Sequence, residues 1–133
     1  MKKESPSMDQ WLRKAKAAPG AENCGMYLVH NGTVRQTAKS MVRQGAADTM
    51  PVCGMRFSYD AEKVEQAVSE TREREGIFYV RAWLNEGELQ LGDDIMFVLI
   101  GGDIRPRVVD ALQSLVGTLK NDCVTEIELY HSL

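Results

Sequence analysis

The residues of this sequence best suited to hold an anionic substrate are three cations, Arg35, Arg105 and Lys120. Arg35 closes segment 32–35 just past a predicted strand, where a guanidinium can fork onto a phosphate. Arg105 follows segment 101–104 at the start of a predicted helix, whose free amide groups favour anions. An ordinary role, as a surface arginine or as a helix entry, stays open for both segments.

Lys120 ends the predicted second long helix, where a lysine usually complements the helix dipole. At about 100° per residue, however, Lys120 projects near Val109 and Val116, on the apolar stripe of its helix. A lysine directed at a buried face needs a partner or has a function. Lys120 is therefore the candidate catalytic group of this sequence.

The histidines and cysteines show no metal-binding or nucleophile pattern. His30 and His131 are single histidines without a spaced partner, so we expect neither a catalytic nor a metal-binding role for them. The three cysteines form no C-x-x-C pair, which argues against a zinc site or a disulfide framework. We therefore expect no metal and no cofactor, and a reducing cytoplasm as the location.

The composition indicates one globular domain. With 133 residues and 44% hydrophobic residues, the chain can bury a substantial core. No segment has the uninterrupted apolar length of a membrane span, and the first ten residues lack the apolar centre of a secretory signal. The net charge of −3 gives no reason to expect a nucleic acid or a membrane as partner.

The elements that must position the cations are predicted from hydrophobic periodicity and turn residues. Two main helices are predicted at 61–75, with Asp60 as N-cap, and at 105–120, with an apolar stripe of Val109, Leu112, Val116 and Leu119. One or two helical turns are predicted within 11–18. Strands are predicted at 26–34, 55–59, 77–84, 88–91, 94–100 and 124–130.

The order of these elements predicts an α+β fold, with two main helices packed on mostly antiparallel strands. The nearly all-apolar segment 94–100 should be covered on both faces and end at 101–103. Residues 1–20 are expected to form a tail and short helix, mobile over 1–10, ahead of a single domain at 21–133. Segment 36–54 has no period, and we expect residues 36–52 to be poorly ordered without ligand.

Three segments together resemble the large, catalytic subunit family of molybdopterin synthase. They are Gly32-Thr33-Val34-Arg35, the block from Gly87-Glu88-Leu89 to Val98, and the 105–120 helix with its following strand. Their order and spacing match over residues 24–130, and Trp11-Leu12 matches a tryptophan-leucine pair of the family. The 87–98 block is the most specific of the three, although its own role is structural.

The resemblance implies an α/β-hammerhead-like fold and a homodimer with a ubiquitin-like small subunit at each outer end. That small subunit ends in Gly-Gly carrying a thiocarboxylate. The implied reaction transfers two sulfurs to cyclic pyranopterin monophosphate, which gives the dithiolene of molybdopterin in molybdenum cofactor biosynthesis. No metal is implied for this step.

The resemblance also implies roles for individual residues. Lys120 matches the essential lysine, Arg35 a substrate-contacting arginine, and Arg105 the arginine of a His-Arg pair. Thr33 and Lys39 are further candidates for substrate binding. Arg105 and Lys120 are 15 residues apart, or about 22 Å on one straight helix. We therefore expect a site shared across a two-fold axis, with Lys120 and Arg35 from one protomer and Arg105 from the other.

Other family positions are substituted here. Ile104 replaces the histidine of the His-Arg pair, Ile127 the second catalytic lysine, and Leu84-Asn85 a further His-Arg pair, while segment 123–129 lacks the family proline and tryptophan. A more apolar pocket with weaker substrate binding is the expected consequence. Three alternatives stay open: a divergent synthase, a non-catalytic relative that binds a pterin or a ubiquitin-like tail, and an unrelated α+β domain.

Overall fold

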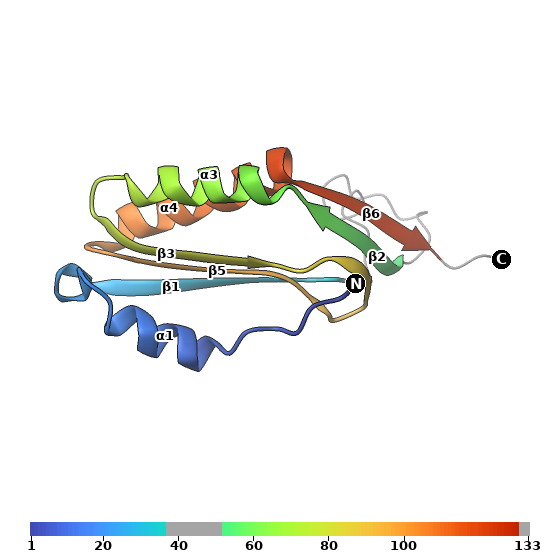
Figure 1. Ribbon diagram of the computed structural model, residues 1–133, viewed down its shortest axis with the longest axis horizontal. Coiled ribbons are helices and arrows are strands. Elements are labelled where there is room, and N and C mark those ends of the chain that lie inside the picture. Colours follow the sequence, from blue (N-terminus) through green and yellow to red (C-terminus); the bar gives the residue numbers. More distant parts are fainter. Residues whose placement is uncertain (37–51, 131–133) are drawn as a thin grey trace.

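The computed structural model describes residues 1–36 and 52–130, which form two antiparallel three-stranded sheets and three α-helices (Figure 1). The first sheet has the order β1-β5-β3, and the second has the order β4-β2-β6. Their bounds are β1 Met26–Thr33, β2 Val52–Tyr59, β3 Ile77–Leu84, β4 Gly87–Gln90, β5 Asp94–Gly102 and β6 Val124–Tyr130. The predicted α+β class is confirmed.

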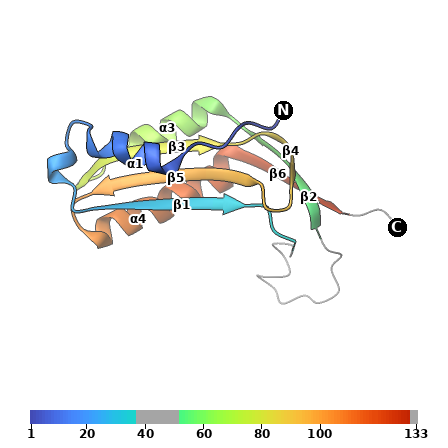
Figure 2. The same ribbon diagram turned by 90° about the horizontal axis from the view of Figure 1, so that it is seen from below.

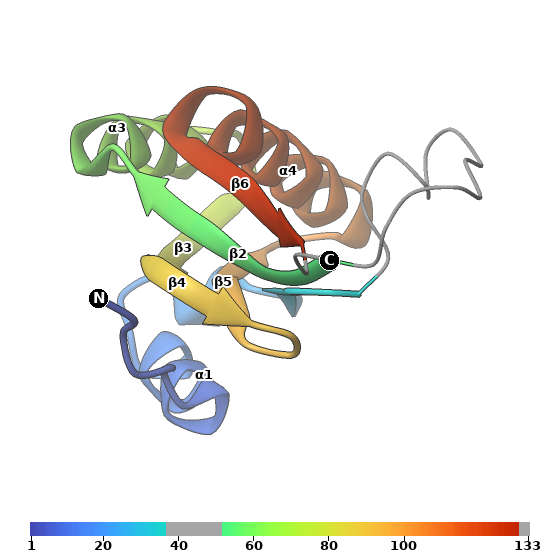
Figure 3. The same cartoon turned by 90° about the vertical axis from the view of Figure 1, so that its right-hand side faces the viewer.

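The helices lie on opposite faces of the first sheet. Helices α3 (Ala61–Arg72) and α4 (Arg105–Thr118) cover one face, and α1 (Met8–Lys16) covers the other (Figures 1 and 2). A 3₁₀ turn, Ala21–Asn23, precedes β1, and a π-helical turn, Leu119–Cys123, joins α4 to β6. Figure 3 shows the second sheet across one end of the molecule, with β6 next to β2. None of the described helices has the length and apolarity that a membrane crossing requires.

The centre of the core is β5, which is buried at every position from Ile95 to Gly102. Met96, Val98 and Ile100 belong to the main core beneath α3 and α4, whereas Phe97 and Leu99 pack with Trp11 and Ala15 of α1. This alternation confirms the prediction of a strand covered on both faces, because successive side chains of a strand point to opposite sides.

Asp60 caps α3 as predicted, since its carboxylate accepts hydrogen bonds from the backbone N–H groups of Glu62 and Lys63. The predicted end of β5 at residue 100 is wrong. Gly101 pairs with Tyr27 and Tyr79, so the strand continues through Gly102. A Cβ at Gly101 would lie 2.6 Å from the Tyr27 ring, so the glycine serves close packing within the sheet rather than a break.

The predicted apolar stripe of α4 is confirmed at Leu119 and is displaced by about one position at its other three residues. The buried residues are Val108, Ala111, Leu115 and, just past the helix, Leu119, whereas the predicted Val109, Leu112 and Val116 are only partly buried. The helix packs against both the first sheet and α3, so its buried face is wider than one stripe. It also ends at Thr118, two residues before the predicted end.

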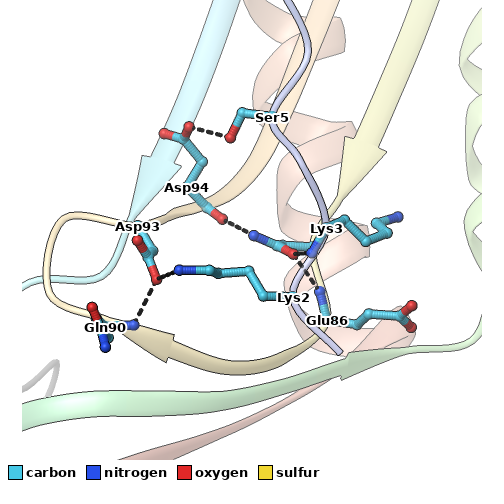
Figure 4. Close-up of polar contacts among 8 residues, drawn as sticks. Lys2, Lys3, Ser5, Glu86, Gln90, Asp93 and Asp94 are labelled. Atoms are coloured by element: carbon cyan, nitrogen blue, oxygen red, sulfur yellow. Dashed lines mark hydrogen bonds and ion pairs between the residues drawn. The ribbon is translucent and has the colours of Figure 1, made fainter.

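Residues 1–7 form an extended N-terminal arm, so the predicted mobility of the first ten residues is wrong (Figure 4). The Lys3 backbone N–H donates a hydrogen bond of 2.7 Å to the Asn85 side-chain oxygen, and the Lys3 ammonium donates to the Tyr59 hydroxyl at 2.9 Å. That ammonium also lies over the rings of Tyr59 and Trp83. Further contacts of the arm are Lys2–Asp93 (3.1 Å) and Ser5–Asp94 (2.6 Å).

The predicted 36–54 loop ends earlier than expected, because β2 begins at Val52 rather than Met55. The Val52 N–H donates to the Gln36 carbonyl oxygen at 2.8 Å. Residues 37–51 lie outside the described residues, so the expectation of poor order there stays a prediction.

Candidate functional site

A pocket of about 300 Å³ lies where β1, the second sheet and the end of α4 meet. Five separate segments of the chain contribute side chains to it. They are His30, Gly32, Thr33 and Arg35 from β1 and its exit, Met55 from β2, Ile95 from β5, Lys120 from the π turn, and Glu126 and Glu128 from β6. The structure therefore brings the predicted Thr33, Arg35 and Lys120 together.

The end of β1 shapes one wall of this pocket. His30 and Gly32 share one face of the strand, because side chains alternate with a period of two. The register with β5 then shifts between Gly32 and Thr33, which redirects the chain as it leaves the sheet. A Cβ at Gly32 would lie 3.5 Å from Met96 and 3.6 Å from the His30 Nε2, so the glycine leaves space beside the imidazole.

Lys120 enters the pocket from the π turn. Leu119 is fully buried, and Lys120 next to it keeps 28% of its side chain exposed, while its ammonium lies 3.0 Å from the Glu126 carboxylate. A π turn adds a residue to the helical repeat, changes the direction of the side chains after it, and is often found at functional sites. The expectation that Lys120 is directed inward and needs a partner is confirmed, and the partner is a carboxylate.

The inward side of β6 carries carboxylates, which the sequence pattern did not predict. Glu126 and Glu128 line the pocket, whereas Ile127 between them is 48% exposed. Ile104, at the N-cap of α4, is 53% exposed and is not among the lining residues of the pocket. Ile127 is therefore outside the lining of this chain's pocket, contrary to the expected apolar effect, whereas Ile104 was expected from the second protomer together with Arg105, so its effect stays a prediction.

The pocket is lined by two positively and two negatively charged side chains, so its formal charges sum to zero. Arg35 and Lys120 are cationic, and Glu126 and Glu128 are anionic. Glu126 pairs with Lys120, and Glu128 accepts a hydrogen bond from the Tyr130 hydroxyl at 3.2 Å. An anionic ligand therefore meets, at Lys120, a cation that already pairs with a carboxylate.

His30 is the pocket residue that sequence reasoning set aside. Its Nε2 atom is buried and has no hydrogen-bond partner among the described residues. Burial, and then the nearby charge of Lys120, lower the pKa of His30 below its ordinary 6.5, so the ring is neutral at pH 7. The sequence does contain one sign of its place in the pocket. His30 lies two residues before Gly32, so both residues are on the same face of the strand that leads into segment 32–35.

A second pocket, of about 380 Å³, adjoins the first and shares His30 and Lys120 with it. Its other lining residues come from the last turns of α4 and the start of the π turn: Leu112, Gln113, Val116, Gly117 and Asn121. His30 and Lys120 therefore form the boundary between two hollows.

The remaining predicted site residues lie elsewhere. Arg105 is exposed at the start of α4, and the unbroken helix of 14 residues, about 20 Å long, separates it from the π turn that holds Lys120. One protomer thus does not bring Arg105 to the pocket. Lys39 lies outside the described residues. Within those residues, no group of three or more His, Cys, Asp or Glu side chains is arranged to hold a metal ion.

Comparisons with known proteins agree on one fold. A sequence profile of the MoaE protein family matches residues 1–122. Molybdopterin cofactor biosynthesis protein E from Burkholderia multivorans matches with a TM-score of 0.69 at 16% identity, over 98% of this chain and 89% of that one. Molybdopterin synthase from Staphylococcus aureus matches with a TM-score of 0.68 at 16% identity, over 84% and 79%.

A third solved structure is a protein-protein complex of subunits 1 and 2 of molybdopterin-converting factor from Helicobacter pylori. It matches with a TM-score of 0.65 at 14% identity, over 96% of this chain and 81% of that chain. No curated protein sequence matches significantly.

Proposed function

This chain belongs to the MoaE protein family, and from that premise we propose that it is the catalytic subunit of a molybdopterin synthase. Family membership and fold support a role in molybdenum cofactor biosynthesis. The observation that carries the proposal is the pocket, which gathers Thr33, Arg35 and Lys120 from distant parts of the sequence. The proposed substrate is cyclic pyranopterin monophosphate, and the proposed sulfur donor is the thiocarboxylate of a small ubiquitin-like subunit ending in Gly-Gly.

The proposed step is a sulfur transfer. At each of two side-chain carbons of the pterin, a carbon–sulfur bond forms and a carbon–oxygen bond breaks, and the oxygen leaves as water or as the phosphate oxygen of the opened cyclic ester. The bond between sulfur and the acyl carbon of the donor then breaks, and water adds to that carbon, so the donor ends as a carboxylate. Two donors supply the two sulfurs of one dithiolene. Lys120 stabilises the negative charge of the intermediate, Arg35 holds the phosphate, and Thr33 offers a hydroxyl to it. Glu126 orients the Lys120 ammonium through their 3.0 Å ion pair.

We further propose a homodimer that brings Arg105 of a second copy to this pocket, because the length of α4 keeps the chain's own Arg105 away. Sedimentation at micromolar concentration should show a dimer, and a monomer would contradict it. A dimer structure with the Lys120 nitrogen more than about 12 Å from both guanidinium groups, beyond a Debye length, would exclude the shared site. The Helicobacter pylori complex supports a small-subunit partner, and a cytoplasmic location is part of the proposal.

A non-catalytic binding module is the second candidate, and the carboxylates of the pocket favour it. Glu126 and Glu128 balance the charges of Lys120 and Arg35, and the family's second lysine is replaced by an outward-facing Ile127. Loss of one member of a catalytic group often costs several orders of magnitude in rate. Such a module would bind the pterin or the Gly-Gly tail without turnover.

Reconstitution separates the two candidates. The chain is mixed with a thiocarboxylated small subunit and cyclic pyranopterin monophosphate, and dithiolene formation is measured together with binding of each component. The synthase proposal expects dithiolene in proportion to the chain added. Binding without dithiolene formation would establish the binding module. A chain that neither binds these components nor forms dithiolene would contradict both candidates.

A further inference from the structure

His30 lies at the centre of the site although no part of the proposed reaction uses it. It comes from β1, opposite Val98 of β5, and it lines both the 300 Å³ pocket and its 380 Å³ neighbour. Among the described residues, Lys120 is the only other one that lines both pockets. Any molecule that extends from one hollow into the other must therefore pass the imidazole and the ammonium group.

The Nε2 atom of His30 is a buried polar atom without a hydrogen-bond partner among the described residues. Such atoms are rare in folded proteins, because burying a polar group without a partner costs free energy. A Cβ at Gly32 would lie 3.6 Å from this atom, in van der Waals contact, so the glycine keeps a side chain away from it. The nitrogen thus has no partner among the described residues, although its residue lines both pockets.

The charge around His30 favours the neutral imidazole. The charged side chains that line the pocket with it are Lys120 of the π turn, Arg35 after β1, and Glu126 and Glu128 of β6. Burial opposes a positive charge on the ring, and the charge of Lys120 opposes it further, so that the pKa of His30 is lowered. A neutral imidazole has one ring nitrogen that accepts a hydrogen bond.

The other polar groups of the pocket are suited to phosphate or already carry contacts within the protein. Arg35 and Lys120 are donors suited to phosphate oxygens. The Glu126 carboxylate is engaged by Lys120, and the Glu128 carboxylate accepts from Tyr130. A pterin ring also carries N–H donors, which require acceptors in the wall of the pocket. His30 adds to that wall a neutral ring whose Nε2 atom has no partner among the described residues.

We propose that the Nε2 atom of His30 accepts a hydrogen bond from an N–H group of the bound pterin and so fixes the ring at the junction of the two pockets. This contact rests on the function proposed above, because it takes the pterin as the ligand. His30 is then a substrate-binding residue on the β1 side of the pocket, next to the cations that hold the phosphate.

The test compares His30→Phe, which removes the acceptor, with His30→Gln, which keeps an acceptor that does not titrate. Binding of cyclic pyranopterin monophosphate is measured by calorimetry from pH 5 to pH 8 in the presence of the small subunit. Gln10→Ala is the control, since Gln10 is an exposed residue of α1 that lines neither pocket. The midpoint temperature of thermal unfolding is measured for each variant.

The phenylalanine variant should bind the pterin about tenfold more weakly at pH 7.5, the effect of one lost hydrogen bond, and the glutamine variant should stay near the parent. The parent should lose affinity as the pH falls through the pKa of His30, because protonation removes the acceptor, and both variants should lack this pH dependence. The phenylalanine variant should unfold at the same temperature as the parent or higher, because it removes an unpartnered buried nitrogen.

Three results would overturn the inference. If the phenylalanine variant binds the pterin with the affinity and the pH profile of the parent, the inference is wrong and the proposed function stands. Weaker binding together with a lower unfolding temperature, and without rescue by glutamine, would make His30 a packing residue. Absence of pterin binding by the parent itself would remove the proposed function and the inference together.

Discussion

Two polar clusters of this chain lie close to the same strands and are built in opposite ways. The arm cluster consists of Lys2, Lys3 and Ser5 of the N-terminal arm and their partners Asn85, Asp93 and Asp94. Asn85 is 1% exposed, and both the oxygen and the nitrogen of its side-chain amide are hydrogen-bonded. Its oxygen accepts from the N–H groups of Lys3 and Glu86, at 2.7 and 2.9 Å, and its nitrogen donates to the Asp94 carbonyl at 2.8 Å. In the pocket, the His30 Nε2 is buried and meets no hydrogen-bond partner among the described residues.

The difference separates a structural polar cluster from a binding site. A buried amide with three good hydrogen bonds stabilises one arrangement of the backbone, and here it attaches the N-terminal arm to the turn between β3 and β4 (Figure 4). An unpartnered buried nitrogen beside an ion pair lowers stability in the free protein and gains its partner from a ligand. Substitutions should therefore affect stability in the arm cluster and activity in the pocket.

The largest effect is expected for Lys120→Ala, measured as dithiolene formation in the reconstituted system. Loss of a cation that stabilises charge in the intermediate should lower the rate by about 10²–10³-fold or more. Lys63→Ala is the control, because Lys63 is an exposed lysine of α3 outside the lining of the pocket. An active parent with an equally active Lys120→Ala variant would show that Lys120 is not the catalytic group.

Asn85→Ala should lower the free energy of unfolding by about 2–4 kcal/mol, since it leaves two partly buried N–H groups and one carbonyl without their partner. Turnover per folded molecule should stay unchanged. Urea unfolding of this variant is compared with that of Asn121→Ala, an exposed asparagine. A loss below about 0.5 kcal/mol, the range of ordinary surface substitutions, would refute the structural role of the cluster.

Glu128→Lys and Ile127→Lys test the orientation of β6. A lysine at 128 faces the pocket and turns its balanced charge positive, so inorganic phosphate should bind about tenfold more tightly than to the parent. A lysine at 127 replaces an outward side chain and should leave phosphate binding within about twofold. The reverse order of effects would show that residue 127 is the inward position, as the resemblance to the family implies.

The smallest effect is expected for Asp93→Asn at the edge of the arm cluster. The Gln90 N–H, and then Lys2, hold the pKa of Asp93 below its ordinary 3.8, against the opposing effect of burial. A depressed pKa contributes stability that is present above pH 3.8 and is lost as the pH falls through the folded-state value. The variant should be less stable by at most about 1 kcal/mol at pH 7.

Acid unfolding monitored by circular dichroism checks this prediction. The difference between Asp93→Asn and the parent should shrink below pH 3.8, because the parent carboxylate is then protonated. A difference that grows with acidification would contradict the assigned direction of the pKa.

Much of the fold follows from local sequence. The apolar segment that became β5 predicted a strand buried on both faces, and Asp60 predicted the start of α3, since both depend on neighbours within a few residues. The family segments identified Arg35 and Lys120, whose side chains then proved to line one pocket. Periodicity was less reliable for α4, whose buried face is set by two packing partners rather than one.

Tertiary structure alone decided how the site is composed. A shift of one residue exchanges the two faces of a strand, so only the pairing of β6 with β2 settled that Glu126 and Glu128 face inward and Ile127 faces outward. The same holds for His30, whose role depends on an imidazole meeting Lys120 from far along the chain. The sequence determined which groups are present and which segments are strands or helices. The packing of two sheets against the end of α4 determined which of those groups share one space, because such contacts join residues that no local pattern connects.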